Sequence, residues 1–368
     1  MNMRVKEKAE GMQVKEKAEG MHVKEKKVTL TNHNTSERHS FVLRPFVPGD
    51  EEAVMQCVRE EYGDSYYRRE FYDRDLLMDM VSSGGLHLFV ATCNGETCGI
   101  QTIISYEPEE SRVEAASQIF KKKYRGYGLP FELVKYTYEY ADTLHPSCIY
   151  ASCVVFHPAT QQMCQDVGMI PVSFNLGSHL TSVMSNSYVL GKSEKYAQAI
   201  LVKPVDKLDA GVVYAHRDVY MIVSRIYSDL GVRYSLVGAT GEESPEAETG
   251  RTELSLKVND REQSVMIYVK RIGRDVGEAV RKVMDAHRGG YWTIQLILPS
   301  DDPASVRAYE TLTGLGFFFT GIRPLCCAHE QITMQYVGDV RFEFDDFRLT
   351  SEFRGLLDQI LKFYEERQ

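Results

Sequence analysis

The stretch that decides the fold is Lys121-Lys-Lys-Tyr-Arg125-Gly126-Tyr127-Gly128-Leu129-Pro130-Phe-Glu-Leu-Val. The residues before it, Arg112–Phe120, predict a strand, and those after it predict a helix to about Leu144. A strand, a loop with glycines two residues apart and a helix can aim backbone N–H groups at phosphate oxygens, because glycine lets the backbone approach closely. The stretch therefore indicates a phosphate-binding loop, with a plain strand-to-helix turn as the open alternative.

The residues upstream predict an α/β domain that begins near Phe41. Residues 41–46 read as a strand, and Pro48-Gly49-Asp50 as the turn and cap of an amphipathic helix, Glu51–Tyr62. A second helix is expected at about residues 73–82. Residues 86–93 and 97–106 then form a predicted hairpin around Asn94-Gly95.

Downstream of the loop helix, residues 148–156 are a continuous apolar run, as in a strand that is buried on both faces. This run leads into His157 and a short helix that is expected to end at a Gly168 C-cap. The order of elements therefore predicts a mixed α/β sheet.

This order resembles the GNAT acyltransferase superfamily over about residues 41–190. In that family an Arg/Gln-x-x-Gly-x-Gly/Ala loop holds the pyrophosphate of acetyl-CoA, and Arg125 to Pro130 fits except that proline stands at the last position. Proline lacks one N–H donor but suits the first turn of a helix. The next helix of the family reads Asn, Ala three residues on, Tyr seven on and Gly-Phe eleven on. This chain has His157, Thr160, Cys164 and Gly168-Met169 at those offsets.

The resemblance implies that acetyl-CoA is the co-substrate and that the loop and the strand before it hold it. In the family, main-chain groups at the end of that strand bind the pantetheine arm, and Phe120 falls at that point. Lys121, Lys122 and Lys123 could meet the CoA phosphates, with a solvated charged rim as the alternative. The expected cofactor-binding residues are Phe120, Lys121, Lys123, Arg125, Gly126, Tyr127, Gly128, Leu129 and Pro130.

Three side chains are candidates for moving protons during acetyl transfer. His157 ends the strand where the acyl group would lie, and imidazole titrates near neutrality, so it is the first candidate base. Glu114, a strand carboxylate beside the expected cleft, is the second. Cys164, at the tyrosine offset, could protonate the departing thiolate. The alternatives are a turn histidine, a solvated strand charge and a packed thiol.

The second half resembles the closing part of a GNAT domain again. A helix is expected over residues 213–230, a hairpin around Asn259-Asp260, and then helix, strand and helix before Gly316-Phe317, with Tyr309 where a family tyrosine often sits. Ile272-Gly273-Arg274-Asp275-Val276-Gly277 is a poor pyrophosphate loop. The sequence therefore predicts two tandem GNAT-like domains, the second one degenerate, closed by an amphipathic helix over Ser351–Glu366.

The first residues repeat with period nine, Val-Lys-Glu-Lys recurring at Val5, Val14 and Val23. Nine helical steps of about 100° put successive valines on opposite faces, so the repeat forms no apolar stripe. A mobile tail and a duplicated leader with an ambiguous start codon explain it equally well. The predicted organisation is a tail at 1–38, an acyl-CoA-binding domain at 39–195 and the degenerate domain at 196–368.

Composition and net charge limit the kinds of ligand and surface that the protein is expected to bind. The 368 residues hold 43 basic and 52 acidic side chains, a net charge of −9, which is poor material for a nucleic-acid surface. The eight cysteines form no CxxC pair, and Cys326-Cys327 reads as reduced thiols, so we expect neither a disulfide framework nor a structural metal. Apolar runs are too short for a membrane helix, which predicts a cytoplasmic protein.

The function predicted from these features is acetyl transfer from acetyl-CoA to a small amine or amino-acid-like acceptor. A non-catalytic acyl-CoA-binding sensor or pseudoenzyme is the alternative, because the family's catalytic offsets are changed. A tandem-GNAT aminoacyltransferase that uses charged tRNA is a third reading, opposed by the acidic balance and by the presence of the loop. The sequence leaves a homodimer open.

Overall fold

A computed structural model describes residues 24–105, 111–180, 194–205, 209–324 and 330–366. The chain forms two compact units. The first comprises Met1–Tyr106 and Ala115–His145, and the second Glu107–Glu114 and Pro146–Gln368. The predicted α/β class with a mixed sheet is confirmed, because both units combine helices with strands.

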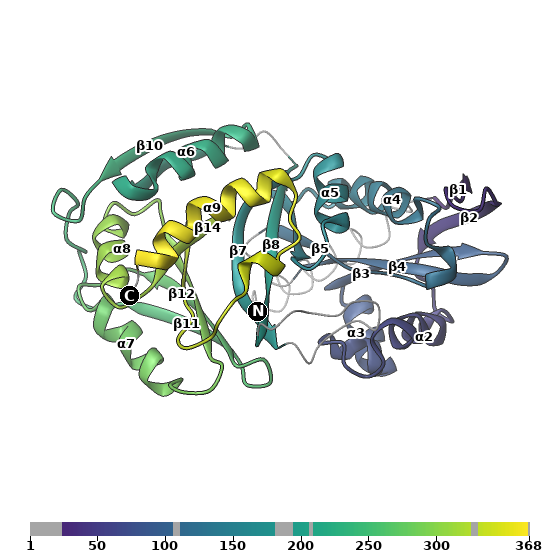
Figure 1. Ribbon diagram of the computed structural model, residues 1–368, viewed down its shortest axis with the longest axis horizontal. Coiled ribbons are helices and arrows are strands. Elements are labelled where there is room, and N and C mark those ends of the chain that lie inside the picture. Colours follow the sequence, from purple (N-terminus) through teal and green to yellow (C-terminus); the bar gives the residue numbers. More distant parts are fainter. Residues whose placement is uncertain (1–23, 106–110, 181–193, 206–208, 325–329, 367–368) are drawn as a thin grey trace, which may run out of the picture. The chain divides into compact units, whose positions relative to one another are not determined.

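In the first unit, helices cover both faces of the sheet β1-β2-β3-β4-β5 (Figure 1). Its elements are β1 (Lys26–Thr31), β2 (Arg38–Pro45), α2 (Glu51–Tyr62), α3 (Arg74–Ser82), β3 (Leu86–Cys93), β4 (Glu96–Ile104), β5 (Arg112–Phe120) and α4 (Leu129–Thr143). Helices α2 and α3 bury Val54, Val58 and Leu77 on one face. Helix α4 covers the other face, where Tyr136 and Tyr140 pack edge-on against Phe89.

Strand β1 lies inside the range that the sequence assigns to the tail. It pairs antiparallel with β2 from Lys26↔Leu43 to Thr31↔Arg38, and its residues alternate between half-buried and exposed. Lys24 O accepts a hydrogen bond from Tyr136 Oη at 3.3 Å. The period-nine repeat carries no signal for this strand, because the repeat bears on helical periodicity, whereas Val28 and Leu30 alternate with threonine as in a strand. Residues 1–23 lie outside the described residues.

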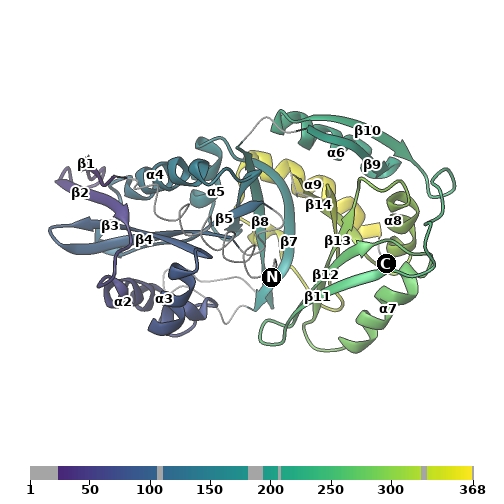
Figure 2. The ribbon, with the colours of Figure 1, turned by 180° about the vertical axis from the view of Figure 1, so that it is seen from behind.

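The second unit contains a mixed sheet with the strand order β6-β8-β7-β14-β15-β13-β12-β11 (Figure 2). Its strands are β6 (Cys148–Val154), β7 (Ile170–Leu180), β8 (Lys195–Pro204), β11 (Glu253–Asn259), β12 (Ser264–Arg271), β13 (Thr293–Pro299), β14 (Phe318–Arg323) and β15 (Gln331–Tyr336). Its helices are α5 (Ala159–Asp166), α6 (Arg217–Leu230), α7 (Val276–Ala286), α8 (Ser305–Thr313) and α9 (Ser351–Glu366).

The same series of strand pairings occurs twice in this unit, in two different sets of strands. The first residues of β5 pair in parallel with β6, β6 pairs antiparallel with β8, and β8 antiparallel with β7. Strands β12, β13, β15 and β14 repeat these pairings in the same directions. The two sets meet where Gly321 of β14 pairs with Ser173 of β7. A Cβ at Gly321 would lie 2.3 Å from Ser173 Cβ, so only glycine allows this approach.

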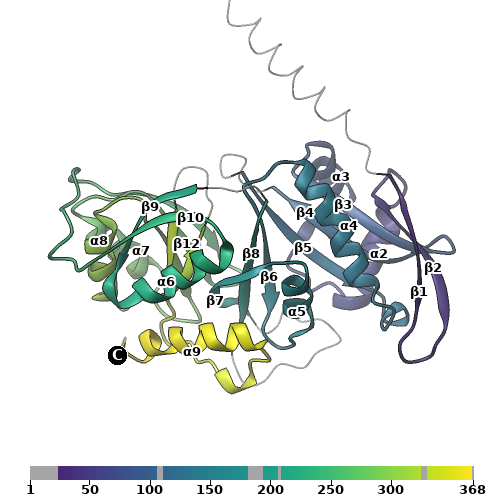
Figure 3. The ribbon, with the colours of Figure 1, turned by 90° about the horizontal axis from the view of Figure 1, so that it is seen from above.

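One predicted helix begins too early. Residues 213–216 belong to β9 (Asp209–His216), which pairs in parallel with β10 (Arg233–Ala239), and α6 begins only at Arg217 (Figure 3). The run Val212-Val213-Tyr214 consists of β-branched and aromatic residues, which favour a strand. The apolar residues at the end of β9 therefore belong to a strand, although they continue the apolar pattern of α6.

Lys195 is a fully buried cation in the second unit. Its Nζ donates to Gln263 O and to Thr293 Oγ1, both at 3.0 Å, and Thr293 Oγ1 donates to Gly177 O at 2.9 Å. Burial lowers the pKa of Lys195 to about 8, because the charged form loses its hydration. Lys195 thus ties β8 to β13 at the cost of a desolvated charge.

We expect a comparison of the wild type with Lys195→Met to show the desolvation of Lys195 as a pH dependence of the free energy of unfolding. Between pH 8 and about 10.5 the unfolded chain keeps the lysine proton that the folded chain has lost, so the free energy of unfolding should rise with pH in the wild type. Relative to the variant, the rise should be on the order of 2 kcal/mol from pH 8 to 10. Urea denaturation at both pH values measures it. Lys362→Met, at an exposed lysine, is the control. An equal pH dependence in wild type and Lys195→Met would contradict the assignment.

Candidate functional site

The glycine loop of the first unit lies between β5 and α4. Gly126 has a φ of +87° and Gly128 a φ of +71°, both in the left-handed region that favours glycine. Helix α4 then begins at Leu129 with Pro130 in its first turn. The predicted strand, loop and helix are therefore all present.

The loop presents a row of backbone donors. Within the described part of the chain, the N–H groups of Gly126, Tyr127, Gly128 and Leu129 donate to no protein acceptor, and the next N–H, that of Phe131, bonds to Gly128 O at 3.1 Å. Gly128 is exposed, and nothing lies within 4 Å of the position where its Cβ would be. Four such donors at the positive end of a 15-residue helix can bind an anion such as a diphosphate.

The turn between β1 and β2 holds the loop from behind. Asn32 Nδ2 donates to Arg125 O at 3.1 Å, and His33 N donates to Gly126 O at 2.9 Å. Asn32 is buried, and its Oδ1 accepts from the N–H groups of Asn34 and Thr35. Sequence reasoning missed this support by placing it in the tail. The turn residues Asn32-His33-Asn34-Thr35 between two apolar-alternating runs were the available signal.

The basic side chains next to the loop are paired with carboxylates of the same unit. Lys121 Nζ lies 3.2 Å from Glu60 and 3.3 Å from Glu96, Lys123 Nζ lies 2.6 Å from Glu96, and Arg125 lies 2.7 Å from Glu61. Bonds from Lys123, then Tyr124 and Lys121, hold the pKa of Glu96 at about 2, so it stays ionised. Three carboxylates and two lysines of this set line a cavity of about 410 Å³: Glu60, Glu61, Glu96, Lys121 and Lys123. A phosphate that binds Lys121 or Lys123 must compete with Glu96.

Two residues at the end of β5 shape the strand beside the loop. Phe120 is buried against Gly99, where a Cβ would lie 2.2 Å from its ring. Ser117 has a φ of +49°, which is strained for a residue with a side chain, and its hydroxyl is 3.1 Å from Tyr66 Oη. The sequence offered no signal for this irregularity, because the run 112–120 reads as an ordinary strand.

The three predicted proton-transfer residues belong to the second unit. Glu114 is the last β5 residue paired with β6, opposite Tyr150, and it is buried. His157 follows β6 and is half-buried beside the Phe156 ring; its carbonyl accepts from Gln161 Nε2 at 3.2 Å. Cys164 is buried, with its Sγ 3.8 Å from Cys153 Sγ. The structure thus gathers the loop residues in one unit and Glu114, His157 and Cys164 in the other.

The second glycine loop, Ile272 to Gly277, is closed by the chain itself. Gly273 N donates to Thr252 Oγ1 and Arg274 N to Thr249 O, both at 3.0 Å, while Val276 N donates to Gly273 O at 3.2 Å. A Cβ at Gly273 would lie 2.2 Å from the carbonyl carbon of Arg251. At the second loop, the segment 249–252 therefore occupies the place that corresponds to the open space beside the first loop.

Tyr309 of α8 is buried as well. Its ring stacks on His216, with centroids 5.3 Å apart and an interplanar angle of 20°. Burial, with Asp218 nearby, raises its pKa. Tyr309 is thus a packed and neutral side chain.

Three further features of the described residues bear on function: metal ligands, cysteines and apolar helices. Within the described ranges, no three His, Cys, Asp or Glu side chains come together so that they could hold a metal ion. The six described cysteines are free thiols, and Cys326 and Cys327 lie outside the described residues. No helix of the described part has the length and apolar content that a bilayer crossing needs.

Solved structures that are similar to part of this chain are N-acetyltransferases. They include an N-acetyltransferase from Staphylococcus aureus Mu50 (14% identity, TM-score 0.38, 45% of this chain and 99% of that chain). Also similar is a mutant spermidine N-acetyltransferase from Vibrio cholerae (16% identity, TM-score 0.37, 45% of this chain and 95% of that chain). A third is a ribosomal-protein alanine N-acetyltransferase from Escherichia coli (9% identity, TM-score 0.35, 45% of this chain and 94% of that chain). No family model and no curated protein matches the chain. Similarity at this level assigns neither a substrate nor a site residue.

Proposed function

We propose that the protein is an acetyl-CoA-dependent N-acetyltransferase that acts on a small amine or amino-acid-like acceptor. The observation that carries the proposal is the row of N–H groups from Gly126 to Leu129, which find no acceptor among the described residues. A diphosphate offers acceptors that suit such a row, and the αL glycines keep side chains out of its way.

Each cofactor-binding residue has a distinct part in this proposal. Main-chain groups of Gly126, Tyr127, Gly128 and Leu129 bind the pyrophosphate, and Pro130 begins the helix whose dipole favours the charge. By the resemblance, the main chain at Phe120 binds the pantetheine arm. Arg125, Lys121 and Lys123 supply positive charge at the rim, although each also pairs with a carboxylate.

The proposed reaction forms a C–N bond and breaks the thioester C–S bond. The acceptor ammonium must lose a proton before it attacks, and the departing thiolate must gain one. His157 is the proposed base and Glu114 the second candidate. The buried contact between Cys164 and Cys153 favours a packing role for Cys164, and its use as the acid stays a prediction.

The tandem arrangement is also part of the proposal. The repeated pairing order of β12, β13, β15 and β14 supports two related copies of one fold. The domain boundary predicted at residue 195 falls inside the second compact unit, so the proposed copies do not coincide with the units. The occupied N–H groups of Gly273 and Arg274 support CoA binding by the first copy alone.

An acyl-CoA-binding sensor without turnover is the second candidate function. It is favoured by the cysteine pair at the position of the family's tyrosine, since a packed thiol leaves the thiolate without the usual acid. This candidate needs the same loop and differs from an enzyme only in turnover.

Calorimetry with CoA and acetyl-CoA, followed by an assay of thiol release across a library of amines, tests both candidates. Saturable binding with thiol release supports the enzyme, and binding without release from any amine supports the sensor. If neither CoA nor acetyl-CoA binds the full chain, both candidates are wrong.

Replacing Glu96 by glutamine should strengthen CoA binding about threefold. The change releases Lys121 and Lys123 from a carboxylate, and exposed charge pairs are worth about 0.2–1 kcal/mol each. Calorimetry at low and high salt measures the gain, which salt should reduce. Glu278→Gln, which frees Lys282 in the second unit with the same change of net charge, is the control. An unchanged affinity in Glu96→Gln would remove Lys123 from the binding site, since Lys121 keeps its pair with Glu60.

A further inference from the structure

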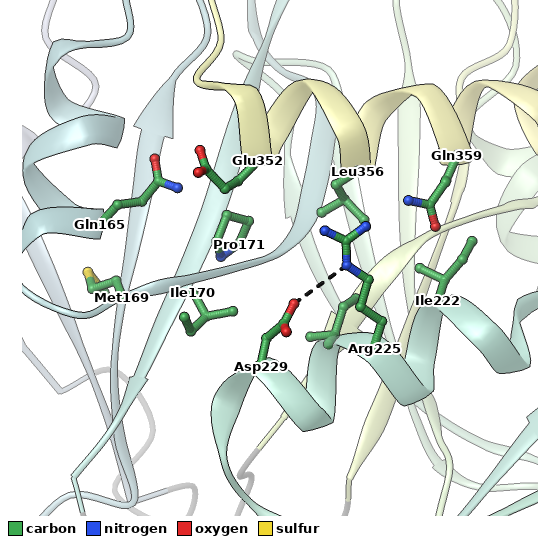
Figure 4. A pocket seen from close by; sticks show the side chains of 11 residues that line it. Gln165, Met169, Ile170, Pro171, Ile222, Arg225, Asp229, Glu352, Leu356 and Gln359 are labelled. Atoms are coloured by element: carbon green, nitrogen blue, oxygen red, sulfur yellow. Dashed lines mark ion pairs between the residues drawn. The ribbon is translucent and has the colours of Figure 1, made fainter.

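A cavity of about 430 Å³ lies within the second unit (Figure 4). Three helices, α5, α6 and α9, and the first residues of β7 line it. Its volume lies within the range of sites for small organic molecules, about 300–1,000 Å³.

One part of the cavity wall is apolar. It is formed by Met169 just before β7, Ile170 and Pro171 at the start of β7, Ile222 and Ile226 of α6, and Leu356 of α9. These side chains offer an aliphatic surface on which an apolar group can be buried, at a gain of about 25 cal/mol per Å².

Another part of the wall offers hydrogen-bond acceptors. Gln165 Oε1 is buried and has no hydrogen-bond partner in the described residues. Figure 4 shows the Gln165 amide and the Glu352 carboxylate pointing toward one another. The backbone N–H of Glu352 and the side chains of Gln165 and Ser351 donate hydrogen bonds to that carboxylate. These bonds lower the pKa of Glu352, so it is ionised at neutral pH. A buried acceptor without a donor is costly, and an ammonium group would supply one.

A positive charge, opposite in sign to the Glu352 carboxylate, is supplied by Arg225 of α6. The Arg225 guanidinium uses its Nε toward Asp229 at 3.6 Å, and its two terminal nitrogens bond to no other described residue. In Figure 4 these nitrogens lie on the cavity side of the helix, beside Leu356. A guanidinium with two free N–H edges is suited to a carboxylate.

We propose that this cavity binds a small zwitterion with an apolar side chain, of the class of apolar α-amino acids. Glu352 and Gln165 Oε1 accept from the ammonium, Arg225 donates to the carboxylate, and the aliphatic wall takes the side chain. A simple amine would leave Arg225 unused, and a simple carboxylate would leave Gln165 Oε1 without its donor. The site is independent of the proposed acetyl transfer, since no residue of the loop takes part.

Calorimetry of the full-length protein with L-phenylalanine, up to 10 mM and without CoA, tests the proposal. Phenethylamine lacks the carboxylate and 3-phenylpropanoate lacks the ammonium, so each should bind at least about 10-fold more weakly than phenylalanine. If phenylalanine gives no saturable heat, or if either analogue binds as well as phenylalanine, the zwitterion assignment is wrong.

Variants then locate the site. Arg225→Met and Glu352→Gln should each weaken phenylalanine binding at least about 10-fold. Arg217→Met is the matched control, because Arg217 is on the same helix, equally exposed and ion-paired to Glu243, but does not line the cavity. Equal affinities of Arg225→Met and Arg217→Met would place any bound phenylalanine elsewhere. Gly128→Val should bind phenylalanine like the wild type, which separates this test from that of the loop.

Discussion

Replacing Gly128 by valine is expected to abolish CoA binding while the protein stays folded. The glycine has a φ of +71° and a ψ of +11°, and the space beside its Cα is open for a ligand. A valine there strains the backbone by roughly 1–2 kcal/mol and fills the place where a pyrophosphate oxygen approaches. Losing two charge-assisted hydrogen bonds should raise the Kd for CoA at least about 100-fold. Calorimetry measures the Kd, and thermal melting the stability.

Gly231→Val is the matched control for this prediction. Gly231 ends α6 with a φ of +66° and a ψ of +21°, and nothing lies within 4 Å of its missing Cβ, so the same strain is added far along the chain from the loop. It should lower the melting temperature as much as Gly128→Val does but leave CoA affinity unchanged. Gly273 cannot serve this purpose, because a Cβ there meets the backbone of Arg251. Undiminished CoA binding by Gly128→Val would overturn the loop assignment.

The His157→Gln variant is expected to lower kcat by about 10²-fold or more, with the Kd for CoA nearly preserved. If His157 takes the acceptor's proton, its loss should also remove the acidic limb of the pH–rate profile, which protonation of an imidazole produces. The His157 carbonyl, which accepts from Gln161, is kept in the variant. Steady-state kinetics between pH 5.5 and 9 measure both effects.

Gln161→Leu separates this catalytic role from a role in holding the turn. Gln161 Nε2 donates to the carbonyls of Val154, His157 and Arg348, and its Oε1 accepts from Thr350 N, so its loss should lower the melting temperature. If His157 only holds the turn, His157→Gln should show the same loss of stability. An unchanged kcat in His157→Gln would remove His157 from the proposed mechanism and leave Glu114 as the candidate base.

Local pattern was sufficient for much of the first unit. The ranges predicted for β3 and β5 agree with the structure, and so does the helix Glu51–Tyr62. These elements could be predicted because their signals are local: Asn94-Gly95 forms the turn between β3 and β4, and apolar residues repeat at the strand or helix period. The two glycines of the loop are a local signal as well, since their positive φ angles are of the kind that glycine favours.

The state of each loop was decided by the tertiary structure. Both glycine loops follow a strand and begin a helix. Among the described residues the N–H groups of Gly126 to Leu129 find no acceptor, whereas those of Gly273 and Arg274 bond to Thr252 and Thr249. Likewise Asn32 supports the first loop from 93 positions earlier in the chain, and Glu96 pairs with Lys123 from 27 positions away. Most strands, helices and glycine turns could be predicted from the sequence, because they depend on neighbouring residues; β1 and β9 are exceptions. Which donors and charges remain available for a ligand was decided only by the folded chain, because a hydrogen bond or ion pair between distant segments leaves no local pattern.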